Sequence, residues 1–128
     1  MKKYLAMLVA LCLLQYNVRG QVQVEEVSKA LQKGDFPRVA AYFDKVVDLT
    51  INDEQSTYSK SQAEMVLKTF AGKHHPRNFQ LQKKGTAPSD QSIWFIGELI
   101  TDSGSFKVYI FFKYKNGQYV LQELRLEQ

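Results

Sequence analysis

Two adjacent histidines are the first residues of this chain that could do chemistry. His74 and His75 stand together in "AGKHHPRNF", residues 71–79. Metal sites need three or four converging ligands, and neighbouring side chains on an extended chain point apart. Because the chain has no third histidine and no carboxylate at a recognisable ligand spacing, we interpret this stretch as a chain connection. We predict no metal site and no cofactor, and keep proton transfer by either histidine as an alternative.

Carboxylates and tyrosines offer a second kind of chemistry. An isomerase or dehydratase needs a base beside a carbon acid and a donor for the developing oxyanion. The candidate bases and donors are Asp48, Glu123, Tyr42, Tyr58 and Tyr119. No motif distinguishes any of them, and Asp48 falls on the predicted wet side of a strand. We therefore predict no catalytic residue and keep such an enzyme as an alternative.

The first twenty residues form a separate unit. Lys2 and Lys3 precede the apolar run "YLAMLVALCLL", which is too short to span a bilayer and is followed by polar "QYN". This pattern predicts a signal peptide over residues 1–20, export to the periplasm or the medium, and one domain over residues 21–128 with no membrane span. A lipid anchor at Cys12 is the alternative, although Leu11 is larger than the residue expected before a modified cysteine.

Removal of that signal changes the composition of the chain. Without Lys2, Lys3 and Arg19, the 17 basic residues become 14 against 13 acidic ones, so the formal charge falls from +4 to +1. A nearly neutral domain gives no electrostatic reason to expect a nucleic-acid partner. Cys12 is the single cysteine and leaves as well, which excludes thiol catalysis, disulfides and thiolate metal sites from residues 21–128.

Hydrophobic periodicity predicts the elements that would position these residues. Helical spacing indicates two short helices that meet at Gly34-Asp35 and a third that runs from Ser61 to Gly72. Ser61 and Glu64 have the spacing of a capping box, and Gly72 is the predicted end of the third helix. "KVVDLTIN", residues 45–52, alternates with period two and predicts a strand, and a short extended piece at Tyr58 follows it.

The last third of the chain predicts antiparallel strands. Asn116-Gly117 is a strong hairpin signal, and a two-residue turn there pairs Tyr114 with Tyr119. A comparable turn at Ser103-Gly104 would pair the strand before it with the strand that leads into Asn116-Gly117. The residue pairs expected from these two turns are Phe112 with Leu121, Leu99 with Val108, Gly97 with Ile110 and Phe95 with Phe112. Both hairpins then place the same side chains of their shared strand on the inner face of the sheet.

The opposite face of this sheet is also apolar. Trp94, Ile96, Tyr109 and Phe111 would lie on it. An antiparallel sheet normally leaves one face to water, so a second apolar face implies another cover. In a chain this short we expect the cover to be a second subunit, and we predict a homodimer through these four residues. Scattered surface aromatics on a monomer are the alternative.

The direction of Glu123 and Arg125 depends on the register of the last strand. In the unbulged pairing both charges point toward the helices, where they would need each other or a ligand. A single bulge after Leu121 would turn Leu124 and Leu126 inward and send both charges to solvent. We favour the bulge and keep the unbulged pairing as the alternative.

The element order resembles the nuclear-transport-factor-two-like (NTF2-like), cystatin-like cone, and "ALQKGDFPRVAAYFDKVVDLTI" looks like the opening of many such domains. Over nearly all of residues 21–128 the chain is also similar to the exported bacterial family DUF4783. That similarity is carried by "VDLTI", "YSKSQAEMVLKTF", "KHHPRNF", "IGELIT" and "YVLQELRLE". The resemblance implies an α+β fold, with three N-terminal helices packed on a strongly curved antiparallel sheet and a cavity between them. It implies no particular reaction.

A cavity in such a cone would be lined from its inner face. The candidate pocket residues are Tyr42, Tyr58, Phe95, Phe112, Tyr114, Tyr119, Glu123 and Arg125. We predict a non-catalytic exported module that binds a small apolar ligand in the cavity or an envelope protein on its surface. The alternatives are the enzyme considered above and an interaction domain whose cone is filled by its own side chains.

Overall fold

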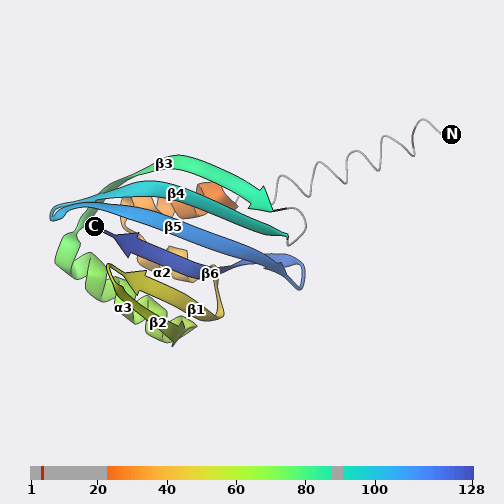
Figure 1. Ribbon diagram of the computed structural model, residues 1–128, viewed down its shortest axis with the longest axis horizontal. Helices are drawn as coiled ribbons and strands as arrows, with labels where there is room; N and C mark the ends of the chain where they lie inside the picture. Colours follow the sequence, from red (N-terminus) through yellow and green to blue (C-terminus); the bar gives the residue numbers. More distant parts are fainter. Residues whose placement is uncertain (1–3, 5–22, 88–90) are drawn as a thin grey trace.

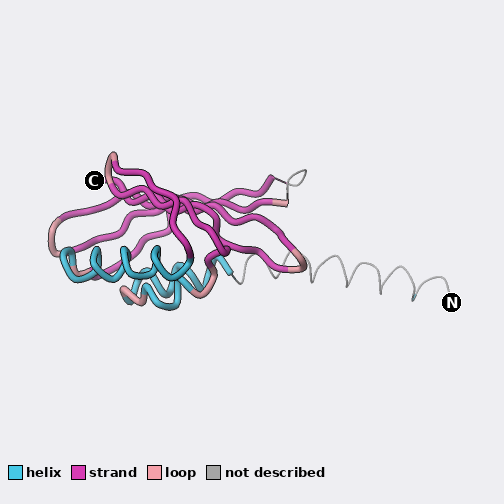
Figure 2. The backbone as a smooth tube through the Cα atoms, turned by 90° about the horizontal axis from the view of Figure 1, so that it is seen from below, coloured by secondary structure: helices cyan, strands magenta, loops and turns pink. Residues whose placement is uncertain are grey.

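The computed structural model describes residue 4, residues 23–87 and residues 91–128. The predicted signal peptide, apart from residue 4, lies outside the described residues. The described chain forms a curved six-stranded sheet with its helices in one layer against one face (Figure 1 and Figure 2). Within the ranges given, no helix is long and apolar enough to cross a membrane.

Two helical segments precede the first strand. Residues 23–33 are helical and bury Val24, Val27, Ala30 and Leu31. Gly34 takes the left-handed conformation, with a φ of 67°, which ends this segment. The short helix α2, Phe36–Ala40, begins at once because the Asp35 carboxylate accepts a hydrogen bond from the Arg38 amide at 3.3 Å. The predicted junction at Gly34-Asp35 is confirmed.

Helix α3, Lys60–His74, begins one residue before and ends two residues after the predicted range. Its capping box is formed by Ser59 and Gln62, not by Ser61 and Glu64. Ser59 ends a strand in the extended conformation that an N-cap requires, so it caps the helix first. The helix continues through Gly72 and ends at His75, which has a φ of 46°. Pro76 explains this end, because proline disfavours helical geometry in the residue before it.

The sheet contains six strands in the order β2-β1-β6-β5-β4-β3. The strands are β1 (Phe43–Ile51), β2 (Glu54–Ser59), β3 (Pro76–Ala87), β4 (Ser92–Thr101), β5 (Gly104–Lys115) and β6 (Gln118–Glu127). β1 pairs with β6 in parallel, so the sheet is mixed and not antiparallel throughout as predicted. A parallel pair needs a long connection, and β2, α3 and the strands β3 to β5 supply it.

The β4–β5 turn lies at Asp102-Ser103, one residue before the predicted Ser103-Gly104. Thr101 closes it, because its hydroxyl donates to the Gly104 carbonyl at 2.7 Å and accepts from the Ser103 amide at 3.1 Å. The register therefore differs by two residues from the predicted one. The pairs observed are Leu99 with Phe106, Gly97 with Val108 and Phe95 with Ile110. Because side chains alternate with period two, the predicted faces of both strands are unchanged.

A β-bulge at Gln122 interrupts the pairing of β5 with β6. The Asn116-Gly117 turn pairs Tyr114 with Tyr119 as predicted, but Phe112 pairs with Leu121 and Phe111 pairs with Glu123. This is the bulge that we favoured. It turns Leu124 and Leu126 toward the helices, where both are fully buried.

The bulge is held by a carboxylate at the start of β1. Asp44 accepts hydrogen bonds from the Gln122 side chain at 3.2 Å and from the Lys115 ammonium at 3.0 Å. Burial by itself would raise the pKa of Asp44, but hydrogen bonds from Lys115, the Lys45 amide and Gln122 outweigh it and hold this pKa below its ordinary 3.8. Asp44 thus joins β1, the bulge and the end of β5.

Aromatic rings fill the space between the inner sheet face and the helices. Phe79 packs on Phe95, and Phe95 packs on Phe112, both at 6.1 Å between ring centroids. Phe79 also lies over Gly97, so a Cβ there would overlap the Phe79 ring and lie 2.6 Å from the Gln80 carbonyl oxygen. The inner face is packed closely enough that one added methyl group has no room.

We expect Gly97→Ala to lower the free energy of unfolding by about 2 kcal/mol, because the added methyl group overpacks the site over which Phe79 lies. Gly72→Ala is the matched control. Gly72 lies in α3 with nothing within 4 Å of an added Cβ, so this change should raise stability by about 0.5–1 kcal/mol. Urea unfolding of the three proteins measures both effects. Equal stability of the two variants would contradict the packing around Gly97.

We expect Asp44→Asn to cost about 1 kcal/mol of stability at neutral pH. The native pKa of Asp44 is lowered, so its contribution is fully present above the unfolded pKa of about 3.9 and is lost as the pH falls through the native pKa. Urea unfolding from about pH 2 to about pH 7 should show the two stabilities converging in acid. Asp53→Asn, in the exposed β1–β2 turn, is the control. A stability difference that did not change with pH would contradict the role assigned to the Asp44 charge.

Candidate functional site

The outer face of the sheet is the side that the helices leave uncovered (Figure 2). Trp94 and Ile96 of β4 lie on it beside Phe111 and Tyr109 of β5. Trp94 pairs with Phe111 and Ile96 with Tyr109, so the four side chains form two adjacent cross-strand pairs. All four are half-buried. We call these four residues the outer patch, and they are the residues predicted for the dimer face.

Trp94 is held in place by a glycine on the neighbouring strand. Gly85 of β3 pairs with Trp94, and a Cβ built on Gly85 would lie 2.5 to 2.9 Å from three atoms of the indole. The indole therefore occupies the space above β3 that another side chain would take. Sequence reasoning missed this contact, although an isolated glycine inside a strand pattern is a known signal for close approach.

An ion pair borders the outer patch on β6. Arg125 Nε donates to Glu123 Oε1 at 2.6 Å, and the guanidinium lies 5.4 Å from the Tyr109 ring centroid. Burial, followed by the nearby Glu123 carboxylate, raises the pKa of the Tyr109 phenol above its ordinary 10.0, and Arg125 acts in the opposite direction. Beside the patch on β6, Glu123 and Arg125 are thus each other's partners.

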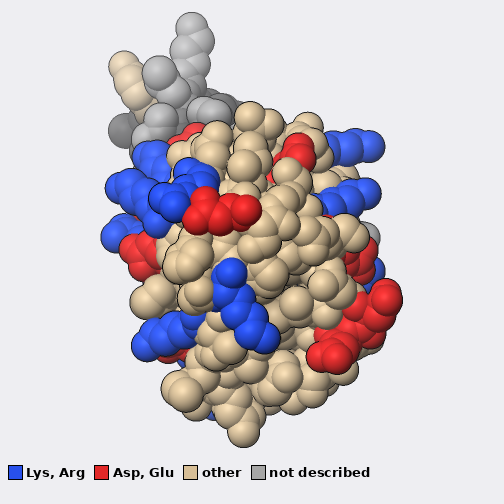
Figure 3. All heavy atoms as spheres, turned by 90° about the vertical axis from the view of Figure 1, so that its left-hand side faces the viewer, with Lys and Arg blue, Asp and Glu red and all other residues tan. Residues whose placement is uncertain are grey.

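Charged residues of both signs surround the outer patch, and we call this set the charged border. It consists of Asp48, Glu98, Glu123 and Glu127 with Lys83, Lys107, Lys113 and Arg125, all placed on the outer face by the strand registers. Four acidic and four basic residues give it no net charge. At the end of the molecule seen in Figure 3, acidic and basic side chains are likewise interspersed. Neither the outer face nor this end of the molecule therefore carries a field of a single sign that would attract a nucleic acid.

The structure does not bring the candidate bases and donors together. Asp48 pairs in register with Glu123 on the outer face, where its carboxylate accepts a hydrogen bond from the Thr57 hydroxyl at 2.7 Å. The candidate donors lie elsewhere: Tyr42, Tyr58 and Tyr119 pack against the buried core cluster. Among the residues described, the predicted acid–base constellation is therefore not assembled.

The predicted pocket residues do not share one environment. Phe95 and Phe112 are fully buried by neighbouring rings, and Tyr114 stacks edge-on against Tyr119 at 5.2 Å. The unbulged pairing, kept as the alternative in which Glu123 and Arg125 line the pocket, is wrong, because the Gln122 bulge turns both residues to the outer face. An open hollow of about 400 Å³ lies elsewhere and contains none of the predicted residues. It is lined by Asn52, Asp53, Glu127 and Gln128.

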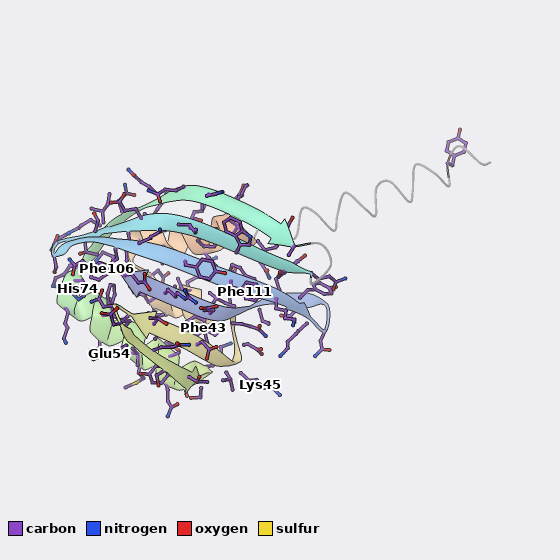
Figure 4. All side chains as sticks on the ribbon, in the orientation of Figure 1. Phe43, Lys45, Glu54, His74, Phe106 and Phe111 are labelled. Atoms are coloured by element: carbon purple, nitrogen blue, oxygen red, sulfur yellow. The ribbon has the colours of Figure 1, made fainter. Side chains whose placement is uncertain are left out.

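The two histidines end α3 and do not form a metal site. His74 packs between Phe70 at 4.7 Å and Phe106 at 4.9 Å, and Figure 4 shows it beside Phe106 at the end of the helix. His75 supplies the left-handed cap. Among the described residues, no group of three or more histidine, cysteine, aspartate or glutamate side chains could hold a metal ion.

The main chain at the end of α3 is tied to the β4–β5 turn. The Asp102 amide donates to the His74 carbonyl at 2.9 Å. The Asp102 carboxylate accepts two hydrogen bonds from Arg77, at 2.6 and 2.8 Å, and the largest cause of its lowered pKa is this guanidinium. These contacts give the histidine stretch a role in chain connection.

Comparison with known families identifies the chain. The model of the family described as "Domain of unknown function (DUF4783)" matches residues 24–127. The chain belongs to the DUF4783 family. A comparison with curated protein sequences finds no similar protein.

Solved structures of DUF4783 proteins have the same fold. A protein from Bacteroides uniformis is 29% identical with a TM-score of 0.77, covering 81% of this chain and 94% of its own. A second from Bacteroides ovatus is 25% identical with a TM-score of 0.77, covering 80% and 92%. An NTF2-like protein of unknown function from Cytophaga hutchinsonii, 11% identical with a TM-score of 0.57, covers 80% of this chain and 83% of its own. This last likeness shows an NTF2-like fold and nothing more.

We expect substitutions on β6 to move the pKa of Tyr109 in opposite directions. Glu123→Gln removes a nearby negative charge, so phenol ionisation becomes easier and the pKa falls, while remaining above 10.0 because of burial. Arg125→Gln removes the cation that favours the phenolate, so the pKa rises. Carbon-13 NMR of labelled tyrosine measures both shifts, with Tyr109→Phe used to assign the signal. Shifts of the same sign would contradict the arrangement around Tyr109.

Proposed function

We propose that this DUF4783 protein is an exported, non-catalytic binding protein whose working surface is the outer face of its sheet. The supporting observation is the outer patch, which places four large apolar side chains side by side on a face without a helix cover. Single exposed apolar residues are ordinary, but a contiguous patch with a polar rim is typical of an interaction site. Export is inferred from the signal-like residues 1–20.

The packing of the inner face favours a surface over an internal pocket. Phe95 and Phe112, two predicted pocket residues on the central strands, are fully buried and pack on each other. We infer that the domain over residues 21–128 is an NTF2-like cone with three N-terminal helices, and that its own side chains fill much of the cone. A small apolar ligand held inside is therefore less well supported than a partner held outside.

The composition of the outer patch suits binding. Trp94, Tyr109 and Phe111 are of the residue types enriched at the centres of protein interfaces. The enzyme alternative has no comparable support, because its candidate bases lie on the outer face while the candidate tyrosines pack on the other side. A binding role is also consistent with the charged border, because charges of both signs set the orientation of a bound partner more than they increase its affinity.

We expect a photoreactive residue in the outer patch to capture a partner in living cells. Phe111→p-benzoylphenylalanine keeps an aromatic ring at the patch, and Met65→p-benzoylphenylalanine is the control on α3, where Met65 is 67% exposed. Irradiation of the producing host should give a specific covalent adduct from position 111 and none from position 65. The mass of the adduct reads out whether the partner is a protein or a smaller molecule.

The two positions make the test decisive for the surface. An adduct from position 65 with none from position 111 would place the working surface on the helix layer and overturn the proposed function. Fractionation and thermal unfolding check that the two variants are exported and folded to the same extent. A missing adduct then cannot be attributed to poor export or misfolding.

A further inference from the structure

The two edges of the sheet differ in length. β2 and β3 are the outermost strands in the strand order, and Figure 1 shows them at opposite edges of the sheet. An edge strand has unpaired main-chain N–H and C=O groups, and proteins often shorten such a strand to limit pairing with other chains. β2 has 6 residues, whereas β3 has 12. The β3 edge is therefore long enough to receive a further strand of ordinary length.

The start of β3 is covered, but the rest of its edge is open. The Gln32 side chain donates to the Phe79 carbonyl at 3.2 Å. Among the described residues, no hydrogen bond from outside the β3–β4 ladder reaches residues 80–87. The bulge at Gln82 leaves five regularly paired residues, 83–87, beyond it, which is the length of an ordinary strand. We call residues 80–87 the free edge.

The free edge has two lysines and no acidic residue. Lys83 pairs with Ile96 and lies on the outer face, whereas Lys84 pairs with Phe95 and lies on the inner side. Both lysines are exposed, and in the part of the chain that the structure describes neither forms an ion pair. Lysines on an edge oppose pairing with a basic strand. A strand with two adjacent acidic residues would instead place one carboxylate beside each lysine.

The free edge also offers apolar contacts on both sides. Leu81 pairs with Gly97 on the inner side, where its side chain is 41% exposed. On the outer side the Trp94 indole lies over Gly85. Alternate side chains of an added strand would therefore lie beside Leu81 and beside the indole. Strand addition takes its affinity from main-chain hydrogen bonds and its specificity from such alternating contacts.

We propose that the free edge of β3 binds an extended, acidic segment of a partner protein, which adds to the sheet as a further strand. The unpaired main-chain groups hold the segment, and Lys83 and Lys84 select two adjacent acidic side chains on it. This inference goes beyond the proposed function, because it concerns the edge of the sheet and does not need the outer patch to be occupied.

Amide NMR titration of the isotope-labelled protein with synthetic peptides tests this inference. The probe is a short peptide, blocked at both ends, in which two adjacent glutamates lie between valines and threonines. It should shift the amide signals of residues 80–87 and slow their hydrogen exchange. A peptide with lysines in place of the glutamates should bind at least tenfold more weakly.

Two further peptides distinguish strand addition from attraction between charges. Each has N-methyl groups on alternate residues, one peptide on the odd positions and the other on the even positions. N-methylation removes the amide donors that a strand pair needs, and only every second residue of an added strand faces the free edge. One of the two peptides should therefore bind at least tenfold more weakly than the unmodified probe, and the other should bind nearly as well.

The variant Lys83→Glu/Lys84→Glu should weaken binding of the acidic probe at least tenfold, because both attractions become repulsions. The matched control is Lys45→Glu/Lys73→Glu, which makes the same change of charge at exposed positions of β1 and α3 and should bind almost as the wild type does. Thermal unfolding checks that both variants are folded. Added salt should weaken binding to the wild type.

Three results would overturn strand addition at β3. They are a probe that leaves the amides of residues 80–87 unchanged, equal binding of both N-methylated peptides and the unmodified probe, and a Lys83→Glu/Lys84→Glu variant that binds as tightly as the wild type. These measurements do not depend on position 111. Failure of the crosslink there would overturn the proposed function and leave this inference standing.

Discussion

One extra residue in β6, Gln122, decides which side chains of the last strand face the helices. Because side chains alternate along a strand, a single inserted residue exchanges the two faces for everything that follows it. Leu124 and Leu126 are fully buried as a result, and each contributes about 1.5–3 kcal/mol by leaving water. Without the bulge, Glu123 and Arg125 would be taken out of water instead, at a cost of several kcal/mol per ion. This difference in free energy between burying two leucines and burying two charges explains why the strand adopts the bulged register.

Asp44, at the start of β1, stabilises the bulged register of β6. Its carboxylate binds the side chain of the bulged residue and the Lys115 ammonium, and the Leu121 amide donates to the Tyr42 carbonyl at 2.7 Å just before the bulge. The parallel pairing of β1 with β6 begins at this point and then shifts its register between Phe43 and Asp48. The bulge and the start of β1 therefore support each other, and the β5–β6 hairpin is joined to the first part of the chain.

Local signals in the sequence predicted much of the fold. The Asn116-Gly117 turn, the junction at Gly34-Asp35 and the alternation of β4 and β5 each depend on residues close together in the chain, and all three are confirmed. The errors came from competition between similar local choices. Ser59 caps α3 in place of Ser61, and the Thr101 hydroxyl moves the next turn to Asp102-Ser103.

Contacts between distant residues were harder to predict. The parallel pairing of β1 with β6 joins segments that only the folded sheet brings together. For the candidate site, alternation identified the outer patch, but it could not say whether Glu123 and Arg125 bordered that patch or lined a cavity. A bulge leaves little trace in composition, so the direction of these charges followed only from the observed register.

The same bulge connects the packed interior with the outer surface. By turning two leucines inward it helps to fill the space under the sheet, where Phe79, Phe95 and Phe112 already pack in sequence. By turning Glu123 and Arg125 outward it supplies a paired, charged edge to an apolar patch that would otherwise lack one on β6. A protein whose interior is filled by its own rings has its remaining apolar surface outside. For that reason we propose the outer face of the sheet as the recognition surface of this domain.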